Sequence, residues 1–121
     1  MARILVTGGA GWLGSTVVRR LASRGDQVVA LDNFQAGTPV NLEKLGGSVR
    51  LIPGDITDLS GLLLLIKAHK IQRIVHAAAI VSVVSSLAAP SYVTRVNIEG
   101  TLNVLEAMRL FDVERTVHIS S

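Results

Sequence analysis

Short apolar runs alternate along the chain with longer segments in which apolar residues recur every three or four positions. The short runs are rich in Val, Ile and Leu, which is typical of strands buried on both faces. The pattern predicts strands at Arg3–Thr7, Gln27–Leu31, Val49–Pro53, Arg73–His76 and Thr116–Ser120. It predicts helices at Gly11–Arg24, Asp58–His69 and Ser91–Phe111, with one or two helical turns at Val40–Leu45.

Alternating strands and helices predict a doubly wound parallel sheet with right-handed crossovers and helices on both faces, a three-layer α/β architecture of the Rossmann type. Residues at the helix ends support this assignment. Asp58 can cap the second helix, Pro90 precedes the third, and Gly25 follows the first, where a left-handed residue is favoured. Gly100 is costly inside the third helix, which suggests close packing against a strand. We expect the segment Val81–Pro90 to be a loop.

Composition limits the chain to one soluble domain, residues 1–121, which is long enough for one core. There is no cysteine, so a thiolate metal site is excluded, and we expect no bound metal and a cytoplasmic location. The longest apolar stretches fall short of the roughly 20 residues of a membrane span. The net charge is +3, but the basic residues are scattered without interleaved aromatic residues, so we expect no nucleic-acid partner.

The strongest motif is the sequence T-G-G-A-G-W-L-G at residues 7–14, between an apolar strand and a helix. Gly8 allows a sharp turn, Gly11 removes a Cβ that would block a pyrophosphate, and Gly14 lets the helix approach the strand. The free amides of the helix start, including those of Trp12 and Leu13, would face the anion. The alternative is a glycine-rich turn without a ligand.

A carboxylate follows the second predicted strand at Asp32, 24 residues after Gly8. In a dinucleotide site this carboxylate would accept hydrogen bonds from the adenosine ribose and would repel a 2′-phosphate. The cofactor predicted is therefore NAD rather than NADP, with Asn33 beside it. The alternative is that the pair of residues only ends a strand.

The glycine spacing resembles the T-G-x-x-G-x-x-G turn of the short-chain dehydrogenase/reductase superfamily, and three further motifs resemble its extended branch, the NAD-dependent epimerase/dehydratase family. The resemblance assigns Asp55 and Ile56 of G-D-I-T-D to the adenine, and assigns the small side chains of H-A-A-A at 76–79 to the nicotinamide ribose and the pyrophosphate. These small side chains are Ala77, Ala78 and Ala79. His76 itself is expected to be structural. Asn97 of N-I-E-G-T-L-N resembles the asparagine that supports the active-site strand, and we include it among the cofactor residues.

Sugar-nucleotide 4-epimerases are the most similar branch, mainly through L-D-N-F at 31–34 and through the segment Val81–Pro90, in which Ser82, Ser85 and Ser86 lie where the family first contacts its substrate. We assign Ser82 and Ser85 to substrate binding. The resemblance implies an enzyme that oxidises a hydroxyl of a nucleotide sugar transiently by hydride transfer. It also implies a homodimer formed by the helix Ser91–Phe111 together with the helix that follows Ser121 in the family.

The family's fifth strand delivers a catalytic serine or threonine, and the resemblance assigns this role to Ser121, with Ser120 beside the cofactor. The family also requires Y-x-x-x-K, which this chain lacks: its one tyrosine is Tyr92, the residue four positions later is Val96, and no lysine follows Lys70. Because the sequence stops within a motif and its mean hydropathy is high at +0.47, we expect an N-terminal portion without its substrate lobe, inactive alone.

Two alternatives to the sugar-nucleotide enzyme remain. The apolar stretch Ala77–Val84 would also suit a steroid- or flavonoid-type dehydrogenase of the same branch. The missing tyrosine and lysine would suit a dinucleotide-binding module without catalytic activity.

Overall fold

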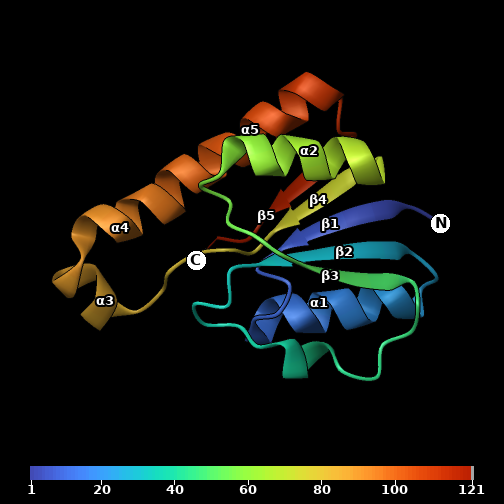
Figure 1. Cartoon of the computed structure of the whole chain (residues 1–121), viewed down its shortest axis with the longest axis horizontal. Helices are drawn as coiled ribbons and strands as arrows, with labels where there is room; N and C mark the ends of the chain where they lie inside the picture. The colour runs from blue at the N-terminus through green and yellow to red at the C-terminus, as the bar shows by residue number, and fades with distance from the viewer. Residues whose placement is uncertain (121) are drawn as a thin grey trace.

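Five parallel strands form one sheet in the order β3–β2–β1–β4–β5 (Figure 1). The structure, a computed structural model, describes residues 1–120. The strands are β1 Arg3–Thr7, β2 Gln27–Asp32, β3 Val49–Pro53, β4 Arg73–His76 and β5 Arg115–His118. This order confirms the predicted doubly wound fold, since the chain moves outward from β1 to β3 and then crosses back to β4 on the other side of β1.

The carboxyl ends of β1 and β4 meet at the point where the crossovers change direction. Thr7 lies opposite Leu31 of β2 and opposite His76 of β4. In doubly wound sheets the crevice outside such a switch point is the usual ligand site. The fold therefore brings the predicted motifs to one edge of the sheet.

One face of the sheet is covered by α1 (Trp12–Ser23) and by η1, a short 3-10 segment at Pro39–Leu42. Alternate strand residues such as Ile4 and Val6 pack there against Val18 and Leu21 of the helix. Gly25 follows α1 with φ +91°, the left-handed conformation predicted for it. The expected helical turn at Val40–Leu45 is present but begins at Pro39 and ends at Leu42.

The other face is covered by α2 (Leu59–His69) and α5 (Gly100–Phe111), which lie side by side above the strands in Figure 1. Leu5, Leu62, Ile66 and Ile74 are almost fully buried in this second core, together with Val104 of α5. Asp58 caps α2 as predicted, because its side chain accepts a hydrogen bond from the amide of Gly61. The two cores and the sheet make the three predicted layers.

The segment expected to be a loop contains a short helix, α3 (Val83–Ala88), so that prediction is wrong over these six residues. The side chain of Ser82 caps α3 by accepting a hydrogen bond from the amide of Ser85 at 3.1 Å. Two adjacent β-branched residues, Val83 and Val84, lower the helix propensity of this segment, so the sequence pattern did not predict a helix here. No residue of α3 is buried.

The long predicted helix Ser91–Phe111 is helical throughout but is built from three parts. A first helix, α4 (Pro90–Thr94), continues into the π-helical turn η2 (Arg95–Glu99) and then into α5. Gly100 at the junction packs closely, as its cost in a helix suggested, but its partner is the side chain of Ile56 in the loop after β3 and not a strand.

Strand β5 is displaced from its predicted range. It begins at Arg115 and ends at His118, two residues before Ser120, although the amide of Ile119 still donates to the carbonyl of His76 at 3.1 Å. Within residues 1–120, no helix has both the length and the apolar character needed to cross a bilayer.

Candidate functional site

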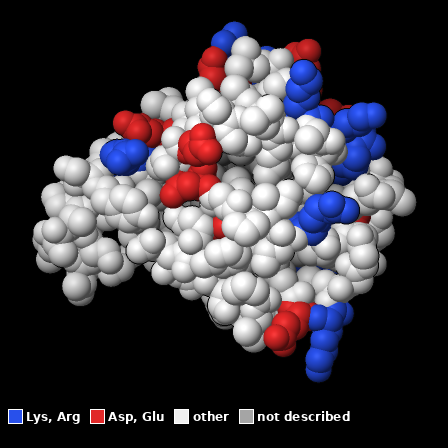
Figure 2. All heavy atoms as spheres, viewed as in Figure 1, with Lys and Arg blue, Asp and Glu red and all other residues white. Residues whose placement is uncertain are grey.

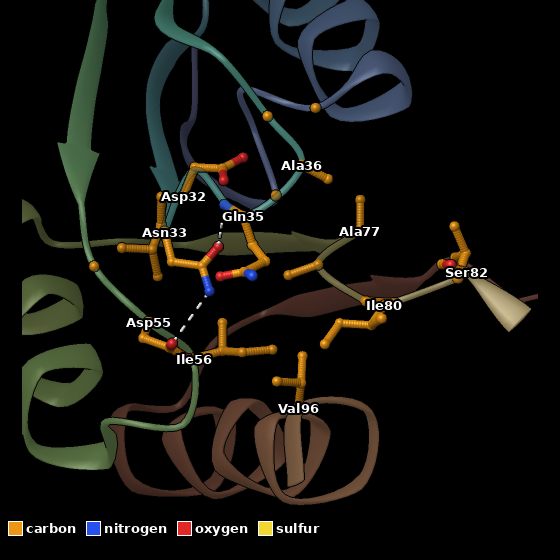
Figure 3. Close-up of a pocket in the computed structure, with 18 of the residues that line it drawn as sticks. Asp32, Asn33, Gln35, Ala36, Asp55, Ile56, Ala77, Ile80, Ser82 and Val96 are labelled. Carbon is orange, nitrogen blue, oxygen red and sulfur yellow. Dashed lines mark hydrogen bonds between the residues drawn. The ribbon is translucent and has the colours of Figure 1, made fainter. Parts of the chain in front are cut away.

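A pocket of about 380 Å³ opens at the carboxyl edge of the sheet (Figure 3). Eleven of the predicted site residues line it: Gly8, Gly11, Asp32, Asn33, Asp55, Ile56, Ala77, Ala78, Ala79, Ser82 and Ser85. Figure 3 shows Asp32, Asn33 and Asp55 at one end of the pocket and Ser82 at the other. The fold therefore brings together motifs that lie after four different strands.

The glycine turn after β1 is constrained by the turn after β4. Gly8 has φ +68°, and a Cβ at this position would lie 2.9 Å from the Cα of Ala78. A side chain is therefore excluded by backbone conformation and by space. Gly11 lines the pocket with an extended backbone, so the pocket wall at this point consists of main-chain atoms without a side chain.

Gly14 acts in packing and does not line the pocket. A Cβ at Gly14 would overlap the carbonyl of Gly8, so the first turn of α1 can approach β1 only without a side chain there. Trp12 and Leu13 begin α1 with exposed side chains, and neither lines the pocket. Their amides, like that of Gly14, belong to the first turn of the helix, whose donors have no acceptor within the helix. The assignment of these three residues to the cofactor therefore depends on their backbone and stays a prediction.

The Asp32 carboxylate is buried and oriented by two backbone donors. Its Oδ2 accepts from the amide of Ala10 at 2.9 Å and its Oδ1 accepts from the amide of Phe34 at 2.8 Å. Each carboxylate oxygen can accept a second hydrogen bond, and Asp32 also lines the pocket. The carboxylate therefore holds the glycine turn in place and presents a fixed negative charge to the pocket.

Asp55 lines the pocket beside Asn33, whose side-chain amide donates to the Asp55 carboxylate at 3.2 Å. Partial burial raises the pKa of Asp55, but hydrogen bonds from the amide and hydroxyl of Thr57, the Asn33 amide and the charge of Arg95 outweigh it, and the pKa lies below its usual value. Asp55 is therefore a carboxylate at neutral pH and accepts hydrogen bonds. The bond with Asn33 ties the ends of β2 and β3 together.

His76 is buried in a chain of hydrogen bonds beneath the pocket. The Thr101 hydroxyl donates to the carbonyl of Asn97, so its oxygen accepts from Nε2–H of His76 at 2.9 Å. Nδ1 of the ring then accepts a hydrogen bond from the Thr7 hydroxyl, with 2.7 Å between Oγ1 and Nδ1. The Thr7 oxygen in turn accepts hydrogen bonds from the amides of Ala77 and Ala78. The network is satisfied only by a neutral imidazole, which supports the structural role predicted for His76.

Two asparagines of the long helical segment hold the loops beside the pocket. Asn97 accepts a hydrogen bond from the amide of Ile80 and donates to its carbonyl, at 2.8 and 3.0 Å. Asn103 donates to the carbonyl of Ile56 at 2.8 Å. Asn97 does not line the pocket, so its assignment to the cofactor stays a prediction, whereas its support of the loop after β4 is direct.

The serines have different surroundings. Ser82 and Ser85 line the pocket and also form the capping interaction of α3, so their positions are fixed by that short helix. Ser86 bonds to the carbonyl of Val83 and does not line the pocket. Ser120 is exposed beyond the end of β5 and also lies outside the pocket lining. The predicted catalytic residue, Ser121, lies outside the described residues.

Other lining residues were not predicted from the sequence: Leu31, Gln35, Ala36, Gly37, Gly54, Ile80, Val81 and Val96. The sequence indicated Gly37 only as a turn residue. The structure shows why glycine is required there, since a Cβ would lie 2.7 Å from Oδ2 of Asp32. The loop after β2 is joined to the glycine turn because the Thr38 amide and the Asn41 side chain donate to the carbonyl of Ala10. Within residues 1–120, no three His, Asp or Glu side chains are grouped to hold a metal ion.

The sequence matches the NAD dependent epimerase/dehydratase family over residues 4–121. This chain belongs to that family. The match confirms the family indicated by the glycine turn, the G-D-I-T-D segment and the helix motif. A family defined by NAD dependence also agrees with the cofactor predicted from Asp32.

Relatives within the epimerase/dehydratase family include the UDP-glucose 4-epimerases of Mycolicibacterium smegmatis, 42% identical, and Erwinia amylovora, 39% identical. Each alignment covers 98% of this chain but only 38% and 36% of the respective relative. The chain therefore spans little more than a third of the length of these epimerases.

Solved structures show the same fold. The UDP-glucose 4-epimerase of Thermus thermophilus in complex with NAD is 37% identical with a TM-score of 0.85, over 94% of this chain and 36% of that one. The Thermotoga maritima enzyme with UDP-glucose is 32% identical with a TM-score of 0.92, over 98% of this chain and 38% of that one. Both support the fold.

The buried His76 predicts a pH dependence of stability. Burial first, and the charge of neighbouring His118 second, lower the pKa of His76 from 6.5 to about 4. The unfolded chain takes up this proton near pH 6.5 and the folded chain only near pH 4, so the stabilisation is complete above pH 6.5 and is lost as pH falls toward 4. At about 1.4 kcal/mol for each pH unit, the loss amounts to about 3 kcal/mol.

Urea unfolding between pH 7.5 and pH 4 measures this loss. His76→Gln should remove it, because the amide does not titrate, whereas the matched variant His118→Gln should keep most of it, since burial of His76 is unchanged. Parallel pH profiles for the original chain and His76→Gln would contradict this assignment.

Proposed function

We propose that this chain is the NAD-binding portion of a sugar-nucleotide epimerase. The observation that supports this most strongly is the pocket itself, in which the bare glycine turn, the Asp32 carboxylate and the alanine turn after β4 line one cavity at the switch point of the sheet. Family membership and UDP-glucose 4-epimerase relatives support the same function.

The residues of the pocket fit NAD in order along the cavity. The amides at the start of α1 and the bare backbone of Gly8 and Gly11 suit the pyrophosphate, since a helix start offers free donors and partial positive charge. Asp32 suits the adenosine ribose hydroxyls. Asp55 can accept from the adenine amino group, and the Ile56 side chain can pack on the ring.

Discrimination against NADP follows from the electrostatics at the end of β2. Asp32 is fixed by two backbone amides, so it cannot move away from an added 2′-phosphate. Like charges held in a partly buried pocket repel more strongly than in water. The structure also offers no arginine or lysine among the pocket residues to accept that phosphate.

We expect Asp32→Asn to weaken NAD binding roughly tenfold, because charge-assisted hydrogen bonds to the ribose are lost. Binding of NADP should change less or improve, so the preference for NAD should shrink. Calorimetry with both nucleotides measures this, with circular dichroism to verify folding.

Asp58→Asn is the matched control. It makes the same chemical change at an exposed helix cap outside the pocket, where asparagine caps as well as aspartate. Equal weakening by both variants, or no NAD binding by the folded original chain, would contradict the proposed site.

Substrate chemistry would occur at the far end of the pocket from Asp32. Bound NAD would supply a hydride acceptor there, and Ser82 and Ser85 would contact the sugar nucleotide. Ser121 would hydrogen-bond the reacting hydroxyl. The proton must pass to a base, which in this family is a tyrosine with a nearby lysine to lower its pKa. This sequence contains no such pair, so the chain alone would not catalyse the reaction.

The two alternative functions receive less support. The relatives and solved neighbours described above are UDP-glucose 4-epimerases and not steroid or flavonoid dehydrogenases. Apolar residues do line the pocket next to Ser82, namely Ile80 and Val81, which is the feature that a steroid-type substrate would use. A binding module without catalytic activity would have the same cofactor pocket, so only turnover distinguishes it.

A protein that contains this chain together with a Y-x-x-x-K segment should epimerise UDP-glucose and show transient absorbance of reduced nicotinamide. Replacing the tyrosine with phenylalanine in that protein should abolish turnover but leave NAD binding intact. Turnover of an apolar hydroxy-ketone pair without any nucleotide sugar would select the dehydrogenase alternative, and absence of any turnover would select the binding module.

We also infer a homodimer through the long helical segment. Ile98, Leu102 and Leu105 are spaced by four and three residues, so they share one helical face, and each is at least half exposed. Such an apolar stripe favours association with a second copy.

Sedimentation equilibrium should show a dimer that Leu102→Glu dissociates. Val40→Glu, the same type of change on the opposite side of the sheet, should leave the dimer intact. A monomer at every concentration would contradict the inference.

A further inference from the structure

A second pocket, of about 310 Å³, lies at the amino-terminal edge of the sheet, opposite the proposed NAD site. Its residues come from the starts of β1, β2 and β3 and from the end of α2: Arg3, Gln27, Val28, Val29, Gly47, Ser48, Arg50, His69 and Ile71. Figure 2 shows most of the visible Lys and Arg side chains on the side where the strands begin in Figure 1. None of the motifs discussed above explains this pocket.

Three polar side chains of the pocket project from neighbouring strands on one face. Arg3 precedes Leu5 by two residues, Gln27 precedes Val29, and Arg50 precedes Ile52. Leu5, Val29 and Ile52 all pack in the core beneath α2, and side chains two apart share a face of a strand. In the sheet register Arg3 lies beside Gln27, whereas Arg50 lies beside Val29, two residues farther along β2. The two arginines therefore lie on either side of β2, on strands about 10 Å apart at the usual strand spacing.

Arg3 is oriented toward this end of α2. Its Nε donates to the carbonyl of Lys70, the left-handed residue that ends the helix, at 2.9 Å. Its backbone amide is held by the side chain of Gln72. The terminal nitrogens of Arg3 have no hydrogen-bond acceptor within residues 1–120, so they remain available to a ligand.

The charge of the pocket is positive and not neutralised. Its lining contains two arginines and one histidine but no carboxylate. Among the ion pairs of the described residues, Arg24 pairs with Asp26 and Arg73 with Glu114, whereas Arg3 and Arg50 are in none. The partial negative charge at the end of α2 amounts to about half a charge, which is less than the two guanidinium charges.

We propose that this pocket binds a small anion that carries two phosphoryl groups. Arginine suits phosphate because its planar N–H groups match two oxygens at once. A diphosphate has negative charge at both ends, so it can contact Arg3 and Arg50 together, while Gln27 and Ser48 donate to oxygens between them. A single phosphate engages one arginine and leaves the other unpaired.

Titration of the ¹⁵N-labelled chain with inorganic pyrophosphate tests the proposal, because amide shifts locate the site. We expect saturable shifts at Gly47 and Ser48 and weaker binding of orthophosphate. Arg50→Gln should lower the affinity at least about tenfold, as expected for loss of a charge-assisted hydrogen bond. Ser48→Asp places a carboxylate in the pocket and should abolish binding, which gives a second test if Arg50→Gln fails to fold.

Arg115→Gln is the matched control, since Arg115, like Arg50, lies in the first two residues of an edge strand, but on β5 at the far side of the sheet. It should bind pyrophosphate like the original chain. Equal weakening by Arg50→Gln and Arg115→Gln would overturn the proposal, as would shifts confined to Gly8 and Gly11, which would place the anion in the NAD pocket. Equal affinity for orthophosphate would overturn the assignment to two phosphoryl groups.

Discussion

The close approach of the turn after β1 to the turn after β4 is the constraint on which the site depends. The Thr7 hydroxyl is fully buried, donates a hydrogen bond to His76 and accepts hydrogen bonds from the amides of Ala77 and Ala78, so one side chain joins both turns. At Gly8 the backbones are so close that no Cβ fits between them. The two turns lie side by side without large side chains between them, so the main chain lines the pocket at the switch point.

The same network connects the sheet to the helix layer. His76 bonds to Thr101 of α5, Thr101 bonds to Asn97, and Asn97 holds both backbone groups of Ile80. The loops at both sides of the pocket are therefore positioned by one helical segment, since Asn103 holds Ile56 in the same way. The π-helical turn lies at this junction, and such turns are frequent at functional sites because they redirect side chains locally. A shift of the long helix relative to the sheet would change the width of the pocket.

The sequence predicted the fold and most of the pocket because both depend on local patterns. Apolar runs located the strands to within about two residues, and glycines followed by a helix located the turn. Tertiary contacts were less accessible. The motif singled out Asn97, but the sequence did not show that its side-chain amide bonds to both backbone groups of Ile80, a residue 17 positions away. Gly37 was only a turn residue until its approach to Asp32 was known. The helix α3 was missed because a serine cap outweighs two residues of low helix propensity.

The distribution of charge along the sheet follows partly from strand direction. In this fold the helices begin near the carboxyl edge of the sheet and end near its amino edge. Acidic residues are therefore favoured at the carboxyl edge, where helices start, and basic residues at the amino edge, where they end. Asp58 at the start of α2 and Lys67 and His69 in its last turn fit this rule. Arg50 does not, because it lies on a strand and complements no helix end, and Arg3 does so only through its Nε, which donates to the carbonyl of Lys70 at the end of α2. Their convergence on one pocket therefore needs a different explanation, and an anionic ligand provides one.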